Sequence, residues 1–537
     1  MSKNRKEFFL VRWLKRMFLG ARPELSAQDE EKIQTPMRQM LSNFLHKPLA
    51  MTGLIVFLAI FAFVMIGPKY WVLDLSEQDA TLTNLPPSSD MMAVPEKMLA
   101  AGVADIAAGN TYGIGTDANG ELYIWGHTRI TEKIDIANVP DEVLAADISM
   151  IAAGTDHVVA LAEDGQVYVW GNTRLKQDKF GSDMEKAMKK GGKAWEVVQL
   201  EASNQFSAIV TSDGNLYLWG NGNMADVKIR SKYEGKVAKV ALTENEYIAL
   251  MTDGSVAYTG YKDKNSPFAR IPDEVSKKNS AVDIASTAKS VAALTNDGKV
   301  VVWGSATKGE NNVPEFGAKV SKLYGGRYHY TALLEDGSIV TWGDNKYKQL
   351  SVPEELASVK IDRMFVSNYQ NYALDTEGKL HIWGLKGFTL GTDGLGRDML
   401  TRIVNGGKVT MTVGAISVVI ATILGIILGG LAGYFGGKLD MLIMRIAEIV
   451  GGLPFIPFAM ILSAVIGTRL DPTQRMYLIM VVLGVLSWVP TCRLVPPRFW
   501  RSARWNTSPR RRPWASRRAR SCSVISCPTS SPCSSSP

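Results

Sequence analysis

Seven copies of one eight-residue pattern recur along the middle of this 537-residue chain, and they limit its fold more than any other feature. Each copy begins with an acidic residue or asparagine before a glycine, continues with alternating residues, and ends in glycine. The copies are NGELYIWG (119–126), DGQVYVWG (164–171), DGNLYLWG (213–220), DGSVAYTG (253–260), DGKVVVWG (297–304), DGSIVTWG (336–343) and EGKLHIWG (377–384). Asp-Gly and Asn-Gly favour a tight hairpin turn, and the alternation predicts a half-buried strand. The spacing of 39 to 49 residues is that of one four-stranded blade, so residues 101–384 are predicted to form an all-β, seven-bladed propeller.

Tryptophan precedes the final glycine in every copy except the fourth, which has Thr259. We expect these indole rings to wedge between neighbouring blades, and the glycine after each to let the chain turn. The signature residues are Trp125, Trp170, Trp219, Trp303, Trp342 and Trp383.

A second element recurs upstream of the turns, as in IAAGTDHVVALAEDG (151–165) and YGGRYHYTALLEDG (324–337). Together with the Trp-Gly ending, it resembles the repeat of the regulator of chromosome condensation family, whose members form seven-bladed propellers. The resemblance implies structural roles for His157 and His329. A metal site is the alternative, but the five histidines show no ligand spacing, so we expect no metal. The family's exchange-factor activity does not carry over, because fold alone does not determine function.

Apolar segments flank the repeats. The charge-free run 48–68, between Lys47 and Lys69, is long enough to span a membrane as a helix. Further spans are predicted at 409–437, 449–468 and 476–492. The basic N-terminal segment 1–47 should be cytoplasmic, which places the linker 69–100 and the propeller outside the cytoplasm. The predicted fold class is a multidomain membrane protein, with a polytopic α-helical domain that has four spans and an inserted propeller.

The segment that follows the propeller begins GFTLGTDGLGRDMLTRIVNGG (387–407). Over residues 385–494 it resembles the second-type permease subunit of dipeptide, oligopeptide and nickel ABC importers, the binding-protein-dependent transport family. The resemblance implies six spans in all, a cytoplasmic-membrane location and lipid contact. It implies as partners a second permease subunit, cytoplasmic ATPase subunits and an extracytoplasmic solute-binding protein. It also implies that the chain is not an enzyme and carries no cofactor, and we find no P-loop or nucleophile-elbow motif.

Two groups of residues carry the permease resemblance. The motif residues are Gly391, Thr392, Asp393, Gly396, Arg397 and Asp398. Glycines there can adopt positive φ, and the charged side chains can pair and cap a helix that begins near Met399. We favour an extracytoplasmic scaffold over direct contact with the transported solute. The second group, at the cytoplasmic end of a helix, comprises Asp440, Arg445 and Glu448, of which the last two are three residues apart and can pair.

The C-terminal tail 495–537 has nine arginines, eleven serines and three of the four cysteines, but no acidic residue. Our hypothesis is that it is an out-of-frame, disordered translation product. Removing its nine arginines takes the formal charge from +8 to −1, so the basic balance does not indicate a nucleic-acid partner. A genuine Arg/Ser-rich tail that binds RNA or anionic lipid is the alternative.

The leading prediction is a permease subunit that moves peptides or a similar small solute, with the propeller as an extracytoplasmic binding module. The alternative is a membrane-anchored propeller receptor or adhesion protein without transport activity. A closed propeller brings its two ends together, which would let it sit inside the loop between the first two membrane helices. Leu385 and Lys386 would then form a minimal linker back to the permease.

Overall fold

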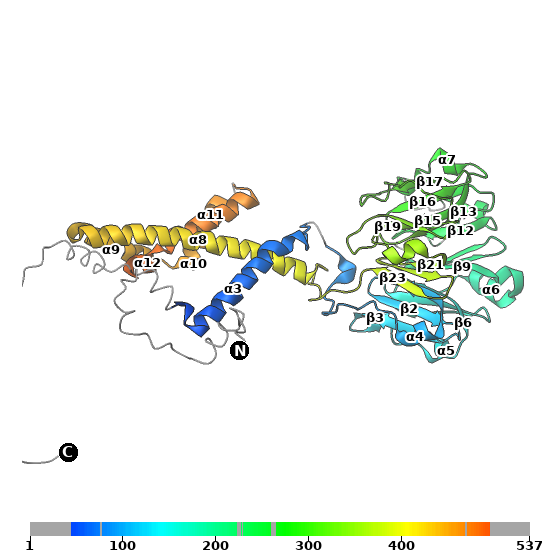
Figure 1. Cartoon of the computed structure of the whole chain (residues 1–537). Coiled ribbons are helices and arrows are strands. Elements are labelled where there is room, and N and C mark those ends of the chain that lie inside the picture. The colour runs from blue at the N-terminus through cyan, green and yellow to red at the C-terminus, as the bar shows by residue number, and fades with distance from the viewer. Residues whose placement is uncertain are drawn as a thin grey trace, which may run out of the picture. The chain divides into compact units, whose positions relative to one another are not determined.

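The computed structural model describes residues 44–75, 78–222, 227, 229–258, 265–467 and 470–494. It divides into two compact units, one formed by Ile66–Asn405 and the other by the described residues on either side (Figure 1). The predicted basic segment 1–47, except for its last four residues, and the tail 495–537 lie outside the described residues.

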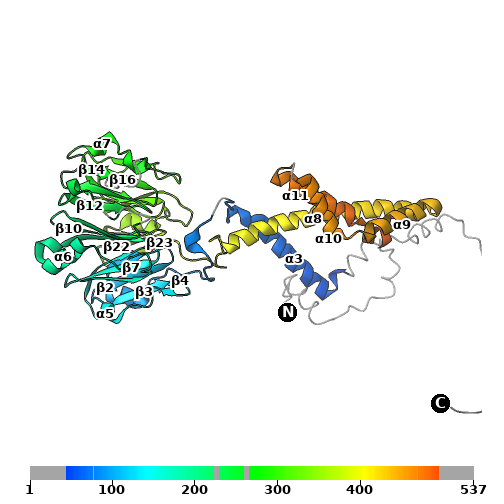
Figure 2. The same ribbon diagram turned by 180° about the vertical axis from the view of Figure 1, so that it is seen from behind.

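The middle unit contains seven antiparallel sheets of three strands each, one for each repeat (Figures 1 and 2). In chain order they are β1 Val103–Ala108, β2 Tyr112–Asp117, β3 Leu122–Gly126; β6 Ile148–Ala153, β7 His157–Ala162, β8 Val167–Gly171; β9 Val197–Ala202, β10 Phe206–Thr211, β11 Leu216–Gly220; β12 Val237–Leu242, β13 Tyr247–Met251, β14 Val256–Tyr258; β15 Ala281–Ser286, β16 Ser290–Thr295, β17 Val300–Gly304; β18 Val320–Gly325, β19 His329–Leu334, β20 Ile339–Gly343; β21 Ile361–Val366, β22 Gln370–Asp375, β23 Leu380–Gly384. The first strands of all seven blades line one central cavity. The prediction of a seven-bladed propeller is confirmed.

The expectation of four strands in each blade is wrong for the described residues, which form three. The segments after the third strands instead carry short helices, among them α5 Asp141–Leu144, α6 Ser182–Lys190, α7 Asp273–Ser276 and the 3-10 helix η6 Glu354–Ser358. Pro140, Pro272 and Pro353 immediately precede three of these helices. Proline cannot donate to a strand ladder, and the acidic residues that follow it suit a helix N-terminus. A small hairpin, β4 Arg129–Thr131 with β5 Ile134–Asp135, follows the first blade.

The second strand of each blade is the most buried. In β7, all six residues of HVVALA are buried, and β10, β16 and β19 share this pattern. These strands have a neighbouring blade on each face, so their side chains do not alternate between core and solvent. The third strands, for which the repeat pattern predicts alternation, are half-buried without it: in β3, β17 and β20, three partly buried residues precede the buried tryptophan.

The ring is closed by contact between the last blade and the first. Met98, Ile106 and Trp125 of the first blade and its preceding helix, α4 Glu96–Ala101, pack in one cluster with Tyr372 and Leu374 of the last. Polar contacts across the same interface join Arg363 Nη1 to the Ala104 carbonyl at 3.2 Å and Asn368 Nδ2 to Asn110 Oδ1 at 2.6 Å. The closure is therefore made by side chains, without a strand shared between blades.

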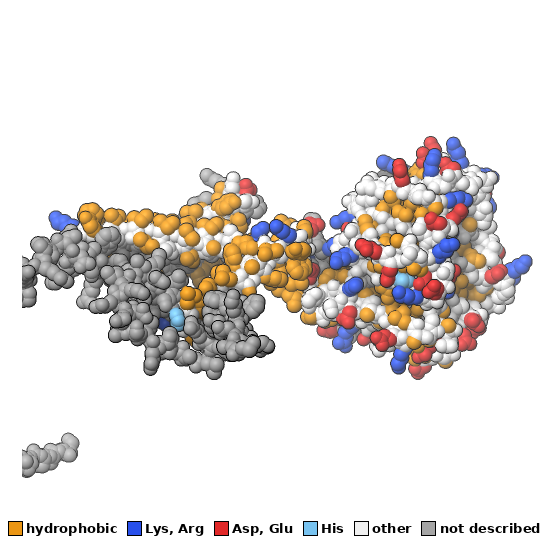
Figure 3. Space-filling model, in the orientation of Figure 1, with side chains coloured by type: hydrophobic (Ala, Val, Ile, Leu, Met, Phe, Trp, Pro, Cys, Tyr) orange, Lys and Arg blue, Asp and Glu red, His pale blue; other side chains and the backbone are white. Residues whose placement is uncertain are grey.

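The other unit is helical. Its helices are α3 Pro48–Ile66, α8 Met399–Phe435 (which begins in the middle unit), α9 Gly437–Gly452, α10 Phe455–Gly467, α11 Pro472–Leu486 and α12 Trp488–Leu494. Among the described residues, three helical stretches are long and apolar enough to cross a membrane: Pro48–Lys69, Met399–Phe435 and Thr473–Leu494. Apolar side chains cover their exposed surfaces (Figure 3). A buried cluster joins α8, α9 and α12 through Ala432, Ala447 and Trp488.

The stretch 449–468, for which we expect a span, is not one continuous helix. Helix α9 ends at Gly452 and α10 begins at Phe455, with Leu453 and Pro454 between them. Proline disfavours helical backbone in the residue before it and supplies no N–H of its own, so a break here has a local cause. The expected number of spans, four present of six, stays a prediction.

Candidate functional site

The chain leaves the helical segments and returns to them through two paired segments, 79–92 and 385–398, which we call the junction. Ser88 and Phe388 form an antiparallel bridge, in which the Ser88 amide donates to the Phe388 carbonyl at 2.9 Å. Four residues further, the Met92 amide donates to the Lys386 carbonyl at 3.1 Å. The entry to the propeller and the exit from it are therefore direct neighbours.

Thr392, one of the predicted motif residues, lies at the centre of the junction. Its hydroxyl accepts a hydrogen bond from the Leu85 amide at 2.8 Å and donates one to the Leu82 carbonyl at 2.5 Å. The Thr392 amide donates in turn to the Leu85 carbonyl at 3.1 Å. All three residues are buried, so this one side chain satisfies two backbone groups that water does not reach.

Gly391 and Gly396 have φ values of 72° and 71°, in the left-handed region that favours glycine. A Cβ on Gly391 would lie 2.3 Å from the Leu85 carbonyl oxygen, and one on Gly396 would lie 1.9 Å from the Asp79 carbonyl oxygen. Both glycines are therefore required by backbone conformation and by the close approach of the other junction segment.

The charged motif residues make the interactions expected of them. Asp393 Oδ2 lies 2.8 Å from Arg397 Nε and 2.7 Å from Arg397 Nη2, and Asp393 Oδ1 accepts the amides of Leu395 and Arg397. The hydrogen bond from Arg397 and these loop amides lower the pKa of Asp393 to about 2. Asp398 accepts the amides of Leu400 and Thr401 and thereby caps the first turn of α8.

A partly buried charged cluster at the junction was not found from the sequence. Asp79 accepts the hydroxyls of Thr81 and Tyr369, and its Oδ2 lies 3.9 Å from Arg327 Nε. Arg327 Nη2 lies 3.7 Å from Glu244. Burial alone would raise the pKa of Asp79, but the Arg327 charge and these hydrogen bonds outweigh it and lower the pKa. Arg327 stands in the turn of YGGRYHY, where five other repeats have an uncharged residue and the fourth has Glu244. These two charged residues were the available signal.

The six signature tryptophans are all buried, with exposures of 2% to 8%. Four of them donate their indole N–H to a carbonyl of the connecting segment 32 to 35 residues earlier, at 2.8 to 3.3 Å. The pairs are Trp170 with Ile136, Trp303 with Phe268, Trp342 with Glu310 and Trp383 with Gln349. These bonds hold the connecting segments against the blades in place of a fourth strand. For Trp125 and Trp219, the described residues provide no partner for the indole nitrogen.

The histidines of the repeats are internal links between blades. His157 Nε2 lies 2.8 Å from Ser207 Oγ of the next blade, and its Nδ1 lies 3.4 Å from Asp156. This order of serine, histidine and aspartate has the form of a nucleophile and its base, but His157 and Ser207 are fully buried, so no substrate can reach them. His329 Nε2 lies 3.2 Å from Asn371 Oδ1, and burial lowers the pKa of His329 to about 4. Within the described residues, no group of three or more His, Cys, Asp or Glu side chains could hold a metal ion.

The second predicted group lies on α9. Asp440 stands in the first turn of this helix, and Arg445 Nη1 lies 2.6 Å from Glu448 Oε2. Both side chains of the pair are more than half exposed, so the pair contributes little to stability.

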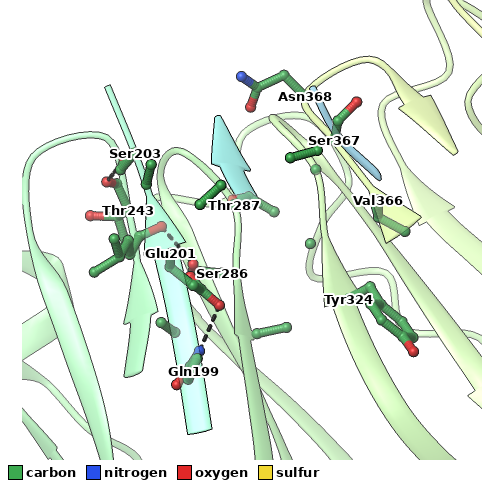
Figure 4. A pocket seen from close by; sticks show the side chains of 18 of the residues that line it. Gln199, Glu201, Ser203, Thr243, Ser286, Thr287, Tyr324, Val366, Ser367 and Asn368 are labelled. Atoms are coloured by element: carbon green, nitrogen blue, oxygen red, sulfur yellow. Dashed lines mark hydrogen bonds between the residues drawn. The ribbon is translucent and has the colours of Figure 1, made fainter. Parts of the chain in front are cut away.

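The central cavity of the propeller has a volume of about 700 Å³ and is lined by the first strands and the turns after them. Figure 4 shows Gln199, Glu201, Ser203, Thr243 and Ser286 gathered on one side of it, and Tyr324 and Ser367 on the other. Some polar side chains of the first strands bind the next blade: Asp105 accepts the Ile151 amide, Gln199 the Val240 amide and Asp283 the Leu323 amide. These side chains occupy the third position of alternate first strands.

Comparisons with known proteins match the permease-like segment and the repeats separately. Residues 35–87 match the family model of the N-terminal transmembrane domain of oligopeptide transport permease C. Residues 148–177 and 320–349 match the model of the regulator of chromosome condensation (RCC1) repeat. The first match ends at Pro87, one residue before the Ser88–Phe388 bridge.

Curated relatives are peptide-transport permeases. The chain is 38% identical over 105 residues to the oligopeptide transport system permease protein OppC of Haemophilus influenzae. The matched region covers 20% of this chain and 32% of the relative. It is 39% identical over 105 residues to the dipeptide transport system permease protein DppC of Bacillus subtilis, covering 20% and 31%. The chain thus spans about a third of the length of these relatives.

Solved structures with a similar middle region have low sequence identity. The structure of Prp20p from Saccharomyces cerevisiae aligns with a TM-score of 0.39 and 19% identity, covering 55% of this chain and 85% of that one. The ectodomain of the receptor kinase ACR4 from Arabidopsis thaliana aligns with a TM-score of 0.38 and 17% identity, covering 53% and 96%. The permease relatives and the three apolar helices indicate a membrane protein. The chain therefore combines segments similar to peptide ABC-importer permeases with an inserted propeller of RCC1-type repeats.

Proposed function

We propose that this chain is a permease subunit of an ABC importer that moves peptides or a similar small solute across the cytoplasmic membrane. The observation that carries the proposal is the junction. Its first segment follows the permease-like helix α3, its second contains the permease motif, and the two pair through Thr392 and the Ser88–Phe388 bridge. The propeller is thus attached at a single point of an otherwise continuous permease loop.

We assign the six motif residues to a scaffold role rather than to solute binding. Gly391 and Gly396 are required by the backbone, Thr392 is used by two backbone groups, and the charges of Asp393 and Arg397 satisfy each other. Asp398 is used as a helix cap. Their polar atoms are engaged inside the loop, which supports a role in holding the entry of α8. The same reading gives the Arg445–Glu448 pair and the tryptophans structural roles.

The partners follow from the permease assignment. We infer a second permease subunit beside the exposed apolar helices, ATPase subunits on the cytoplasmic side and a solute-binding protein on the other side. ATP hydrolysis would then belong to other chains. The Lys/Arg-rich N-terminal segment supports a cytoplasmic N-terminus, which puts the propeller outside the cytoplasm. There the propeller would serve as a protein- or ligand-binding module.

Uptake of radiolabelled trialanine tests the proposal. In cells without this gene, uptake should be lost, and the complete gene should restore it. A variant in which Ser88 is joined directly to Phe388 should still insert in the membrane, and its uptake measures what the propeller contributes. If uptake is the same with and without the gene, the transport assignment is wrong, and a membrane-anchored receptor is the remaining reading.

A further inference from the structure

The central cavity of the propeller has two unlike ends. At one end, four consecutive turns after the first strands, those of the fourth to seventh blades, are bonded to one another. The Glu244 amide donates to the Ala288 carbonyl at 3.0 Å, the Ala288 amide to Arg327 at 2.9 Å and the Arg327 amide to Asn368 at 3.0 Å. Asn368 continues to Asn110 of the first blade through its side chain. The side chains of Glu244 and Arg327, 3.7 Å apart, stand at this end. This end, which adjoins the junction, is constricted.

The opposite end is open. Val198 and Val282, near the starts of β9 and β15, line the cavity there and are 51% and 52% exposed. Glu201 lies three residues further along β9 from Val198, which corresponds to a depth of about 10 Å. The cavity is therefore a cup with one mouth, and its volume of about 700 Å³ lies in the range of small-molecule sites.

Small residues make the room inside the cup. At the fifth position of the first strands, Ala107, Ala152, Ala241 and Ala285 all line the cavity. Glu201 and Tyr324 are the large lining residues in the same layer, and they lie on the third and sixth blades, across the cavity from each other. The alanines leave space beside the carboxylate of Glu201.

The charged side chains of the cup are paired, except those of Lys322 and Glu201. Lys322 Nζ lies 5.3 Å from the centre of the Tyr324 ring. Lys239 Nζ lies 2.6 Å from Asp283, and Arg327 lies beside Glu244 and Asp79. Glu201 accepts a hydrogen bond from Gln199 Nε2 at 2.6 Å, but no basic side chain of the described residues lies within 4.0 Å of it. Burial raises the pKa of Glu201, and the charge of Lys239 and the hydrogen bonds from Gln199 and the Leu242 amide only partly offset this. A cationic group beside Glu201 would stabilise its charge.

The groups around Glu201 also select a hydrogen-bond donor. Ser203 donates its only hydroxyl proton to the Thr243 carbonyl at 2.5 Å, and Ser286 donates its proton to the Leu242 carbonyl at 2.7 Å. Thr243 likewise donates to Glu246. Toward the cavity these oxygens can therefore only accept, as can a carboxylate. A primary ammonium, with a positive charge and three donors, fits this wall.

We propose that the cup binds a small solute through its primary ammonium group, held by the carboxylate of Glu201 and the acceptor oxygens of Ser203 and Ser286. The N-terminus of a short peptide is such a group. The choice of a peptide as solute rests on the proposed function, whereas the ammonium chemistry rests on the cup alone.

Isothermal titration calorimetry on the full chain in detergent tests the proposal, with trialanine, N-acetyltrialanine and putrescine as probes. Trialanine should bind saturably, and acetylation of its amine should weaken binding about tenfold to a hundredfold. Glu201→Gln should weaken trialanine binding by a similar factor. The control Glu335→Gln, at an exposed side chain outside the cup, should bind as the parent does. Competition by putrescine would show that the amine is recognised without a peptide backbone; its absence would assign the site to peptides.

The proposal is overturned if neither trialanine nor putrescine gives saturable binding, or if the acetylated and free peptides bind equally to the parent chain. The second comparison needs no variant, so it holds even if Glu201→Gln does not fold. Binding is measured without transport. Uptake without binding therefore refutes the cup alone, and binding without gene-dependent uptake refutes the permease assignment alone.

Discussion

Replacing Thr392 with valine should open the junction. Valine has nearly the same shape but no hydroxyl, so the Leu85 amide and the Leu82 carbonyl would both lose their partner. Thr392 is only 8% exposed and both leucines are buried, so water replaces these bonds poorly. Each unpaired buried group costs about 1 to 3 kcal/mol, so for the two groups together we expect a loss of about 2 to 6 kcal/mol.

Hydrogen exchange followed by mass spectrometry measures this loss at the Leu85 amide. A change of about 2 to 6 kcal/mol corresponds to a fall in protection of about 30-fold to about 20,000-fold. Thr376→Val makes the same substitution at an exposed turn and should leave protection at Leu85 unchanged. If Leu85 stays as protected in Thr392→Val as in the parent chain, the hydroxyl does not hold the junction and the argument fails.

Three further results are expected. Joining Ser88 directly to Phe388 should preserve membrane insertion, because these residues are already neighbours. Protease protection in vesicles measures the insertion. A chain that no longer inserts would count against the inserted-domain architecture. The pKa of Asp393 is lowered from 3.8 to about 2, so its stabilising effect is present above about pH 4 and is lost as the pH falls toward 2. Hydrogen exchange at the Leu395 amide, which Asp393 accepts, should therefore rise as the pH falls through this range. Asp393→Asn should abolish this rise. Trp342→Phe should lower the free energy of unfolding, measured with urea, by about 1 to 3 kcal/mol more than Trp125→Phe does. Of these two residues, only Trp342 donates to a carbonyl, that of Glu310. Equal losses in the two variants would refute this role.

Much of the propeller was predictable because its signals are local. The Asp-Gly turn and the alternating residues after it lie within eight residues, and both recur seven times. The missing fourth strand also had a local signal, the proline before an acidic pair in stretches such as VPDEVL (139–144), which favours a short helix. The break at Leu453 and Pro454 is similar: the proline is visible, but an average of hydropathy over the stretch conceals it.

The junction and the cup were less predictable because their residues meet only in three dimensions. Asp79 and Arg327 are about 250 residues apart, and no periodicity relates them. Glu201 occupies a position at which four other blades have alanine. The sequence does not show that this position faces the cavity, because that depends on how the blades are arranged in the ring. The motif residues could be named from the sequence, whereas their partners at Leu82, Leu85 and Asp79 could not.

The hydrogen bond between Met92 and Lys386 links the folding of the propeller to that of the loop that contains it. About 290 residues separate these two groups in sequence. When the residues between them are unfolded, bringing these two groups together costs more free energy than closing a four-residue turn. The difference is about 4 kcal/mol, because the entropy of loop closure depends on the logarithm of loop length. The folded propeller removes this cost because its own ends already meet. A propeller that folds before the second membrane helix inserts would therefore act as a short tether, and one that fails to fold would leave the two junction segments held together by their own few bonds.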